Sequence, residues 1–184
     1  QNNYLNNTLT IFSNSNKMIL EKTEIQDLVV VQPAVFEDER GYFLETYNEA
    51  KYQHLLGNHI SFVQDNLSLS ANGVLRGLHF QNMVPQAKLV RCVVGEIYDV
   101  VVDLRKSSET YKQWFGIKLS EENKKMMFVP KGFAHGFLTL SDYAIFHYKC
   151  DELYMATTDA GINFRDEDLK IDWGIDTNLI ITSE

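Results

Sequence analysis

The sequence predicts an all-β protein, a jelly roll or barrel, that carries one short helix. Three observations lead to this prediction. Short runs rich in β-branched and aromatic residues dominate the chain from residue 28 to residue 150. They recur at roughly the 8–12-residue spacing that is typical of sandwiches and barrels. Only one segment carries both the start and the stop signal of a helix.

Nine segments are predicted as strands because residues that strands favour are concentrated in them. In chain order they are 28–33, 42–47, 61–70, 73–81, 87–105, 114–120, 126–130, 132–142 and 144–150. Within 87–105, Gly95 can take the positive φ of a tight turn, so we expect a hairpin there. The helix is expected over 49–56, with Asn48 as its N-cap and Gly57 as its C-terminal stop.

The 184 residues suit one domain with a sizeable core. Residues 1–17, "QNNYLNNTLTIFSNSNK", hold six asparagines and lack the basic start and apolar middle of a secretory signal. We expect them to form a flexible Asn-rich extension, and 18–184 to form the single domain.

Charge and composition restrict the partners. The net charge is −8 and no run of Lys or Arg exists, so nucleic acid is not expected to bind. An anionic ligand would have to be held by local cations. No apolar run approaches 18 residues, which argues against a membrane span. The two cysteines, Cys92 and Cys150, lie in apolar runs and are expected to be reduced thiols of a cytoplasmic protein.

One predicted strand alternates in polarity. Val63, Asp65, Leu67 and Leu69 share one face, and Gln64, Asn66, Ser68 and Ser70 share the other. Two interpretations are open. The polar face is either an outer surface in water, or the wall of a polar cavity inside the barrel.

The stretch "GVLRGLHFQ" (73–81) places Arg76, Gly77 and His79 in another strand, and "GFAHGF" supplies His135. Two histidines beside glycines suggest close approach by a ligand. Strict alternation puts Arg76 and His79 on opposite faces, and a bulge at Gly77 would bring them together. Metal-binding barrels often use an HxH pair, but here Gln81 takes the second position. With two histidines and no nearby carboxylate, we expect no metal.

Long motifs then occur in a fixed order: "FEDERGYFLE", "QDNLSLSANGVLRGLHFQ", "KLVRCVVGEIYDVVVDLRKSSETYKQW", "LSEENKKMMFVPKGFAHGFLTLSDYAIFHYKCDELY" and "GINFRDEDLKIDW". Through them the chain closely resembles the dTDP-4-dehydrorhamnose 3,5-epimerases, from about residue 19 to about residue 176. The resemblance implies a cupin-type double-stranded β-helix, a jelly roll with one or a few short helices. It also implies an isomerase of dTDP-rhamnose biosynthesis that needs no cofactor.

The implied reaction inverts carbons 3 and 5 of a 4-keto-6-deoxy sugar attached to dTDP, through an enolate. The resemblance assigns the base to His79 and the acid on the opposite face to Tyr148, in "FHYKC". It assigns Lys88, in "AKLV", to the cation beside the developing enolate.

The resemblance also implies substrate contacts and a homodimer. Arg76 matches a pyrophosphate contact, His135 a cavity residue and Tyr154 the tyrosine that stacks on thymine. The remaining implied contacts are Gln64, Asp65 and Asn66 in "VQDN", Asp159, and Arg40 and Glu45 in "ERGYFLE", the last two often supplied by a partner subunit.

Asp159 stands where the family usually has a glutamate. Members also orient the catalytic histidine with an aspartate in a C-terminal "SxKD" motif. The sequence given stops at "IITSE", so we expect an incomplete tail and assign no orienting carboxylate.

Three other functions remain open. The first is inversion at carbon 3 alone, or a related heptose epimerase, since pocket shape decides between these. The second is a 3,4-ketoisomerase, although those typically carry "RGxHxH" where this chain has "RGLHFQ". The third is a non-catalytic module that binds sugar nucleotides, which would not need His79, Tyr148 and Lys88 together.

Overall fold

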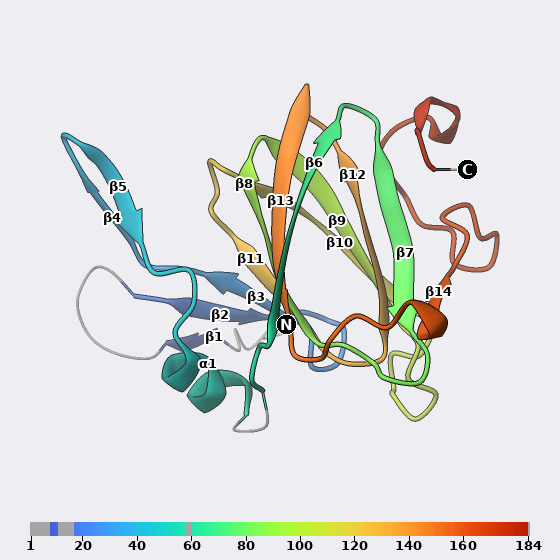
Figure 1. The fold of residues 1–184 in the computed structure, drawn as a ribbon, viewed down its shortest axis with the longest axis horizontal. Coiled ribbons are helices and arrows are strands. Elements are labelled where there is room, and N and C mark those ends of the chain that lie inside the picture. Colours follow the sequence, from blue (N-terminus) through green and yellow to red (C-terminus); the bar gives the residue numbers. More distant parts are fainter. Residues whose placement is uncertain (1–7, 11–16, 58–59, 184) are drawn as a thin grey trace, which may run out of the picture.

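Two antiparallel sheets face each other in the computed structural model, which describes residues 8–10, 17–57 and 60–183 (Figure 1). The seven-stranded sheet has the order β1-β2-β3-β11-β8-β13-β6, and the five-stranded sheet has the order β10-β9-β12-β7-β14. Strands β4 and β5 form a separate hairpin that projects from the body of the molecule. This is the jelly roll that the sequence predicts.

The bounds of the elements are as follows. The seven-stranded sheet contains β1 (Thr8–Thr10), β2 (Ile19–Lys22), β3 (Val29–Gln32), β11 (Met126–Val129), β8 (Lys88–Val94), β13 (Tyr143–Cys150) and β6 (Gln64–Ala71). The five-stranded sheet contains β10 (Trp114–Ser120), β9 (Glu96–Asp103), β12 (Phe133–Thr139), β7 (Leu75–Gln81) and β14 (Asp159–Gly161). The hairpin is β4 (Val35–Asp38) and β5 (Gly41–Leu44), and the helices are α1 (Glu49–Leu56) and the 3₁₀ turns η1 (Ala156–Thr158) and η2 (Thr177–Leu179).

The main core lies between the two sheets. Apolar side chains from both inner faces meet there, among them Val90, Val101, Phe137 and Phe146. The rings of Phe137 and Phe146 lie 4.3 Å apart between centroids, which joins β12 to β13 across the core. Burying such side chains is the main favourable term in folding.

Two smaller clusters cover the outer faces. One packs Tyr52 of α1 against Met126 and Phe128 of β11. The other packs Trp173, from the C-terminal segment, against Val100 and Leu138 of the five-stranded sheet. No helix of the described residues is long and apolar enough to cross a membrane.

The helix forms where the sequence predicts it. The Asn48 side chain accepts a hydrogen bond from the backbone N–H of Lys51, which satisfies one of the free donors of the first turn. Gly57 ends the helix with φ at +109°, and its N–H donates to the carbonyl of Gln53.

The predicted hairpin at Gly95 is wrong, although the glycine has positive φ, at +78°. β8 pairs with β11 and β13, whereas β9 pairs with β10 and β12. The chain therefore crosses from one sheet to the other at this corner. A positive φ permits a sharp bend but does not specify which strands pair. Here the pairing is determined by burial of both apolar strands in facing sheets.

Other departures lie near the chain's start. Residues 35–38 lie outside the predicted strands, but they pair with 41–44 as β4 and β5. Residues 8–10, expected within the flexible extension, form β1 against β2. The rest of that expectation, for 1–7 and 11–16, falls outside the described residues. β2 and β14 were not predicted either.

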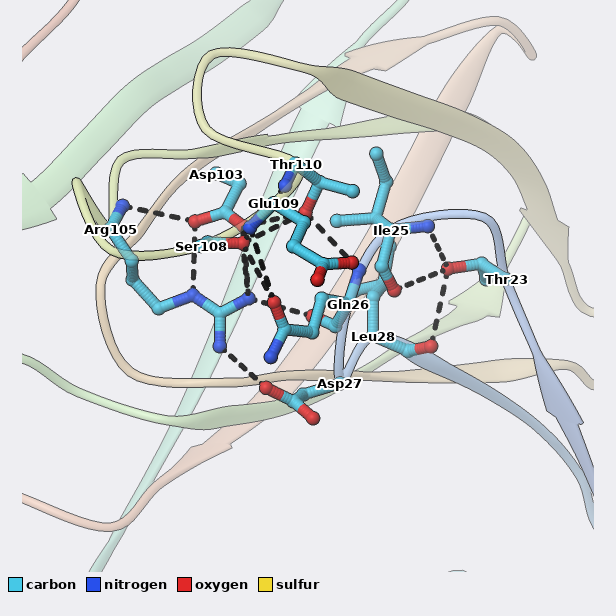
Figure 2. A network of polar contacts seen from close by, with 10 residues as sticks. All are labelled: Thr23, Ile25, Gln26, Asp27, Leu28, Asp103, Arg105, Ser108, Glu109 and Thr110. Carbon is cyan, nitrogen blue, oxygen red and sulfur yellow. Dashed lines mark hydrogen bonds and ion pairs between the residues drawn. The ribbon is translucent and has the colours of Figure 1, made fainter.

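A buried polar network fixes the loop after β9 (Figure 2). The Asp103 carboxylate accepts hydrogen bonds from Arg105 Nε at 2.9 Å, Ser108 Oγ at 2.6 Å and Thr110 Oγ1 at 2.8 Å. Arg105 continues to the segment before β3, where it bonds Asp27 Oδ2 at 2.7 Å and the carbonyl of Gln26 at 2.8 Å. The network thus ties two distant parts of the chain together.

Candidate active site

A bulge in β7 brings Arg76 and His79 to one side of the strand. His79 is opposite His135 of β12 and Arg76 is opposite Phe137, so two residues of β7 face the single residue Gly136. Gly77 has φ at +123°, and a Cβ placed on it would lie 2.5 Å from Gly136 Cα. Only glycine suits this position, and the bulge expected at Gly77 is confirmed.

Both side chains line a cavity of about 740 Å³ between the two sheets. Of the residues predicted from the sequence, His79, Tyr148, Lys88, His135, Arg76, Asn66, Tyr154 and Asp159 line it. They come from β6, β7, β8, β12, β13 and the segment that ends at β14. The fold therefore gathers groups that are up to 93 positions apart in the sequence, from Asn66 to Asp159.

The polar face of β6 is a wall of this cavity. Asn66, Leu67 and Ser68 line it, and the apolar residues Leu67 and Leu69, which alternate with the polar ones, are 66% and 61% exposed. Of the two interpretations of the alternating strand, the polar cavity inside the barrel is correct.

His79 lines the cavity and is exposed there. Partial burial lowers the pKa of its imidazole below the ordinary value, with Lys88 acting in the same direction and Asp159 opposing. The neutral form is therefore favoured at neutral pH, as a proton acceptor requires.

Tyr148 and Lys88 stand together on the facing sheet, on the adjacent strands β13 and β8. The Lys88 ammonium lies 5.7 Å from the centroid of the Tyr148 ring. Burial raises the pKa of the Tyr148 phenol, so it stays protonated. Burial also lowers the pKa of Lys88.

Sequence reasoning missed Asp99, a fully buried carboxylate on β9. Its oxygens lie 2.9 and 3.1 Å from His135 Nε2, which fixes the orientation of that ring in the cavity wall. Burial raises the pKa of Asp99, and the contact with His135 opposes this. The signal was one charged residue inside the apolar run "IYDVVV", since an unpaired charge is rarely fully buried.

The Arg76 guanidinium is anchored at two points on β6. Its Nε donates to Ser70 Oγ at 2.8 Å and its Nη2 donates to the carbonyl of Leu69 at 3.3 Å. The anchored side chain brings a cation to the cavity mouth of an otherwise acidic protein.

Tyr154 and Asp159 stand on the segment after β13. The Tyr154 hydroxyl donates to Asp159 Oδ2 at 3.3 Å, and the Tyr154 ring is largely exposed at the mouth of the cavity. Ile181, Thr182 and Ser183 also line the cavity, because Ile181 pairs with the start of β7 through its backbone. The sequence offered no signal for these three.

Four predicted residues do not line the cavity. Arg40 lies at the tip of the β4–β5 hairpin, paired with Asp38. Glu45 bonds Lys51 and Asn48 at the start of α1.

The other two belong to β6. Gln64 stands just behind the cavity wall, with its amide bonded to Asn66 and to the N–H of Tyr154. Asp65 points outward and is paired with Lys149 at 2.8 Å. The prediction that Asp65 contacts the ligand is therefore not supported in this chain, because adjacent strand residues face opposite sides.

The expectation that no carboxylate lies near the histidines is wrong, because Asp99 bonds His135. Within the described residues, no group of three or more His, Cys, Asp or Glu side chains could hold a metal ion. Gln81, in the position of the missing histidine, is engaged by two loops. That the protein works without a metal stays a prediction.

Known proteins resemble this chain over nearly its whole length. Residues 22–184 match the family model of dTDP-4-dehydrorhamnose 3,5-epimerase. The chain is 53% identical to a dTDP-4-dehydrorhamnose 3,5-epimerase of Methanothermobacter thermautotrophicus, covering 89% of each chain.

Solved structures agree. An enzyme of that name from Elizabethkingia anophelis is 51% identical, with a TM-score of 0.85 and coverage of 91% of this chain and 92% of that one. A dTDP-6-deoxy-D-glucose-3,5-epimerase from Legionella pneumophila, solved with dTDP-4-keto-L-rhamnose, is 44% identical. Its TM-score is 0.87, and the match covers 90% of this chain and 88% of that one.

Proposed function

This chain belongs to the dTDP-4-dehydrorhamnose 3,5-epimerase family of cupin isomerases, and from that premise we propose how its cavity performs the reaction. The reaction inverts carbons 3 and 5 of dTDP-4-dehydro-6-deoxy-D-glucose and gives dTDP-4-dehydro-L-rhamnose. Both carbons lie next to the ketone at carbon 4, so their protons are weakly acidic. Each inversion removes a proton from one face of the ring and returns one to the other.

His79 is the base. A neutral imidazole accepts the proton from carbon 3 or carbon 5, and the electron pair of the broken C–H bond forms an enolate with the ketone oxygen. The lowered pKa of His79 supports this role, because the ring is already neutral at neutral pH.

Tyr148 is the acid and Lys88 stabilises the enolate. The observation that carries this proposal is that His79, on β7, and Tyr148, on β13, line one cavity from facing sheets. A ring bound between them offers one face to the base and the other to the acid. Lys88, beside Tyr148, would place its cation near the enolate oxygen, where such a group contributes about 10²–10³ in rate.

The remaining cavity residues hold the sugar nucleotide. Arg76, anchored on β6, binds the pyrophosphate, and Tyr154 stacks on thymine with Asp159 beside it. Asn66 and His135 complete the walls around the sugar. The anchoring of Arg76 supports its role because a fixed guanidinium loses little freedom when it binds phosphate.

A homodimer completes the site. Arg40, with its side chain 85% exposed, stands on a hairpin that projects from the body of the molecule (Figure 1) and that contributes no residue to this chain's own cavity. Phe36 and Phe43 of that hairpin are exposed as well. We infer that the hairpin packs on a second copy and delivers Arg40 and Glu45 to its nucleotide. We also assign the enzyme to the cytoplasm, which suits its two buried free cysteines.

Deuterium exchange tests the acid and base roles. Wild-type enzyme with the 4-keto substrate in deuterium oxide should give inverted product labelled at carbons 3 and 5. His79→Asn should abolish label at both carbons, because no proton leaves. Tyr148→Phe should keep some exchange without inversion, because the proton returns to its original face.

The two variants serve as controls for each other, since each removes one functional group from the same cavity. Near-normal exchange in His79→Asn would show that the histidine is structural. Normal inversion in Tyr148→Phe would assign the acid to another residue.

A further inference from the structure

Two glutamines hold the segment that carries Tyr154. Gln64 Oε1, on β6, accepts a hydrogen bond from the backbone N–H of Tyr154 at 2.9 Å. Gln81 Oε1, on β7, accepts one from the N–H of Met155 at 2.6 Å. Two successive amides of one segment are thus bonded to side chains from two different sheets.

The geometry suits an extended backbone. Met155 has φ at −125° and ψ at 101°, and successive N–H groups of extended chain point to opposite sides. One glutamine on each side therefore fixes both the position and the rotation of the segment at Tyr154.

Gln81 is buried, and both polar ends of its side chain are hydrogen-bonded. Its side chain is 6% exposed, and its Nε2 donates to the carbonyl of Val84 at 2.9 Å while its Oε1 binds Met155. Both polar ends are satisfied, as a buried amide requires. Gln64 is bonded likewise, since its Nε2 donates to Asn66 Oδ1 at 3.0 Å.

Apart from the backbone bonds to the two glutamines, the Tyr154 side chain has one hydrogen bond, from its hydroxyl to Asp159 Oδ2 at 3.3 Å, among the described residues. Its ring is 53% exposed, so packing contributes little to its position. If the ring had to become ordered when the ligand binds, that ordering would reduce the affinity for the ligand.

We propose that Gln64 and Gln81 are positioning residues that present the Tyr154 ring to the base of the nucleotide. The inference rests on the proposed role of Tyr154. It gives Gln81, which stands where metal-binding barrels carry a histidine, a task in substrate recognition. It also gives Gln64 a supporting role through its bond to the Tyr154 N–H, in addition to the predicted ligand contact.

Gln81→Met and Gln64→Met test the proposal, since methionine keeps the length of the side chain and removes the acceptor. Each should raise the Kd for dTDP and the KM for substrate by roughly tenfold, the effect of one or two lost hydrogen bonds. The kcat and the Kd for inorganic pyrophosphate should stay at the wild-type values, because Arg76 is untouched.

Gln32→Met is the matched control. Gln32 donates a hydrogen bond through its Nε2 to the carbonyl of Asn123, in the loop between β10 and β11, and lies outside the cavity. Its variant should bind dTDP as the wild type does. Melting temperatures of all three variants identify any loss of fold, and the two glutamines provide independent tests.

A double-mutant cycle with Tyr154→Ala decides the mechanism. In the Tyr154→Ala background, Gln81→Met should have no further effect on the Kd for dTDP. An additive loss, or equal loss of dTDP and pyrophosphate binding, would overturn the proposal. Unchanged dTDP binding in both folded glutamine variants would overturn it too, even if Tyr154→Ala alone weakens dTDP. If Tyr154→Ala leaves dTDP binding intact, the stacking role and this inference both fail.

Discussion

Gly77 decides where the two most informative side chains of β7 point. Without its bulge, Arg76 and His79 would face opposite sides of the strand, one toward the cavity and one away from it. The close approach to Gly136 leaves no room for a Cβ. A single backbone requirement therefore links the proposed base to the proposed pyrophosphate contact.

At the scale of single residues, the pKa of His79 predicts the pH dependence of the enzyme. Its imidazole must be neutral to accept a proton, so kcat/KM should rise with pH through the pKa of His79 in the free enzyme. Because burial lowers that pKa, the midpoint of the acid limb should lie below the ordinary histidine value of about 6.5.

Two measurements check this prediction, the profile of kcat/KM across the acid and neutral range and the NMR titration of His79 in the free enzyme. Both should give the same midpoint. A midpoint above the ordinary histidine value would mean that another group controls the acid limb.

At the scale of an element, the loop after β9 depends on one buried carboxylate. Burial by itself would raise the pKa of Asp103, but hydrogen bonds from Arg105, Ser108 and Thr110 overcome this and lower the pKa to about 2 (Figure 2). Since folding lowers the pKa from 3.8, this stabilisation is present above that value and is lost as the pH falls toward 2.

Asp103→Asn should therefore reduce the free energy of unfolding at neutral pH by about 2 kcal/mol, and should weaken the loss of stability in acid. Urea unfolding at several pH values measures both effects. Asp27→Asn is the control, because Asp27 binds the exposed end of the same network and should contribute less than about 1 kcal/mol. Equal effects of the two substitutions on the free energy of unfolding would contradict the conclusion that the buried Asp103 carboxylate stabilises the loop.

At the scale of the whole molecule, an exposed apolar surface on the seven-stranded sheet indicates an interface with a partner. Leu67 and Leu69 of β6 and Tyr143 of β13 are exposed on the outer face of the seven-stranded sheet, near its edge. Monomers rarely leave such a row uncovered. Together with the projecting hairpin, this surface supports the proposed homodimer.

Subunit complementation tests the shared site. Arg40→Ala should weaken nucleotide binding and His79→Asn should abolish turnover. In a mixed dimer, the cavity with an intact His79 receives an intact Arg40 from the other chain. At low substrate, equal mixtures should therefore recover roughly a quarter of wild-type activity, because half of the dimers are mixed and each has one complete site.

The control is to mix each variant with itself, which should give no activity above that of the single variant. If activity of the unlike mixture stays at the mean of the two variants, Arg40 does not act in the partner's cavity. A mass of 21.2 kDa by light scattering would contradict the dimer directly.

The sequence by itself determined the class of fold and, through its motifs, eight of the residues that line the cavity. Alternating and apolar runs predicted strands such as β10 over its full length, and Asn48 and Gly57 predicted both ends of α1. These signals are local, since they depend on neighbours within a few positions. The motif resemblance added His79, Tyr148 and Lys88, which come to line the same cavity.

Only the tertiary structure decided how the strands pair and which side chains support the cavity. The corner at Gly95 leads into the opposite sheet rather than into a hairpin, because burial between two sheets outweighs a local turn preference. Asp99 meets His135 across 36 positions, and Gln81 meets Met155 across 74. Such contacts leave no periodic pattern in a sequence, because each depends on two distant segments being packed side by side.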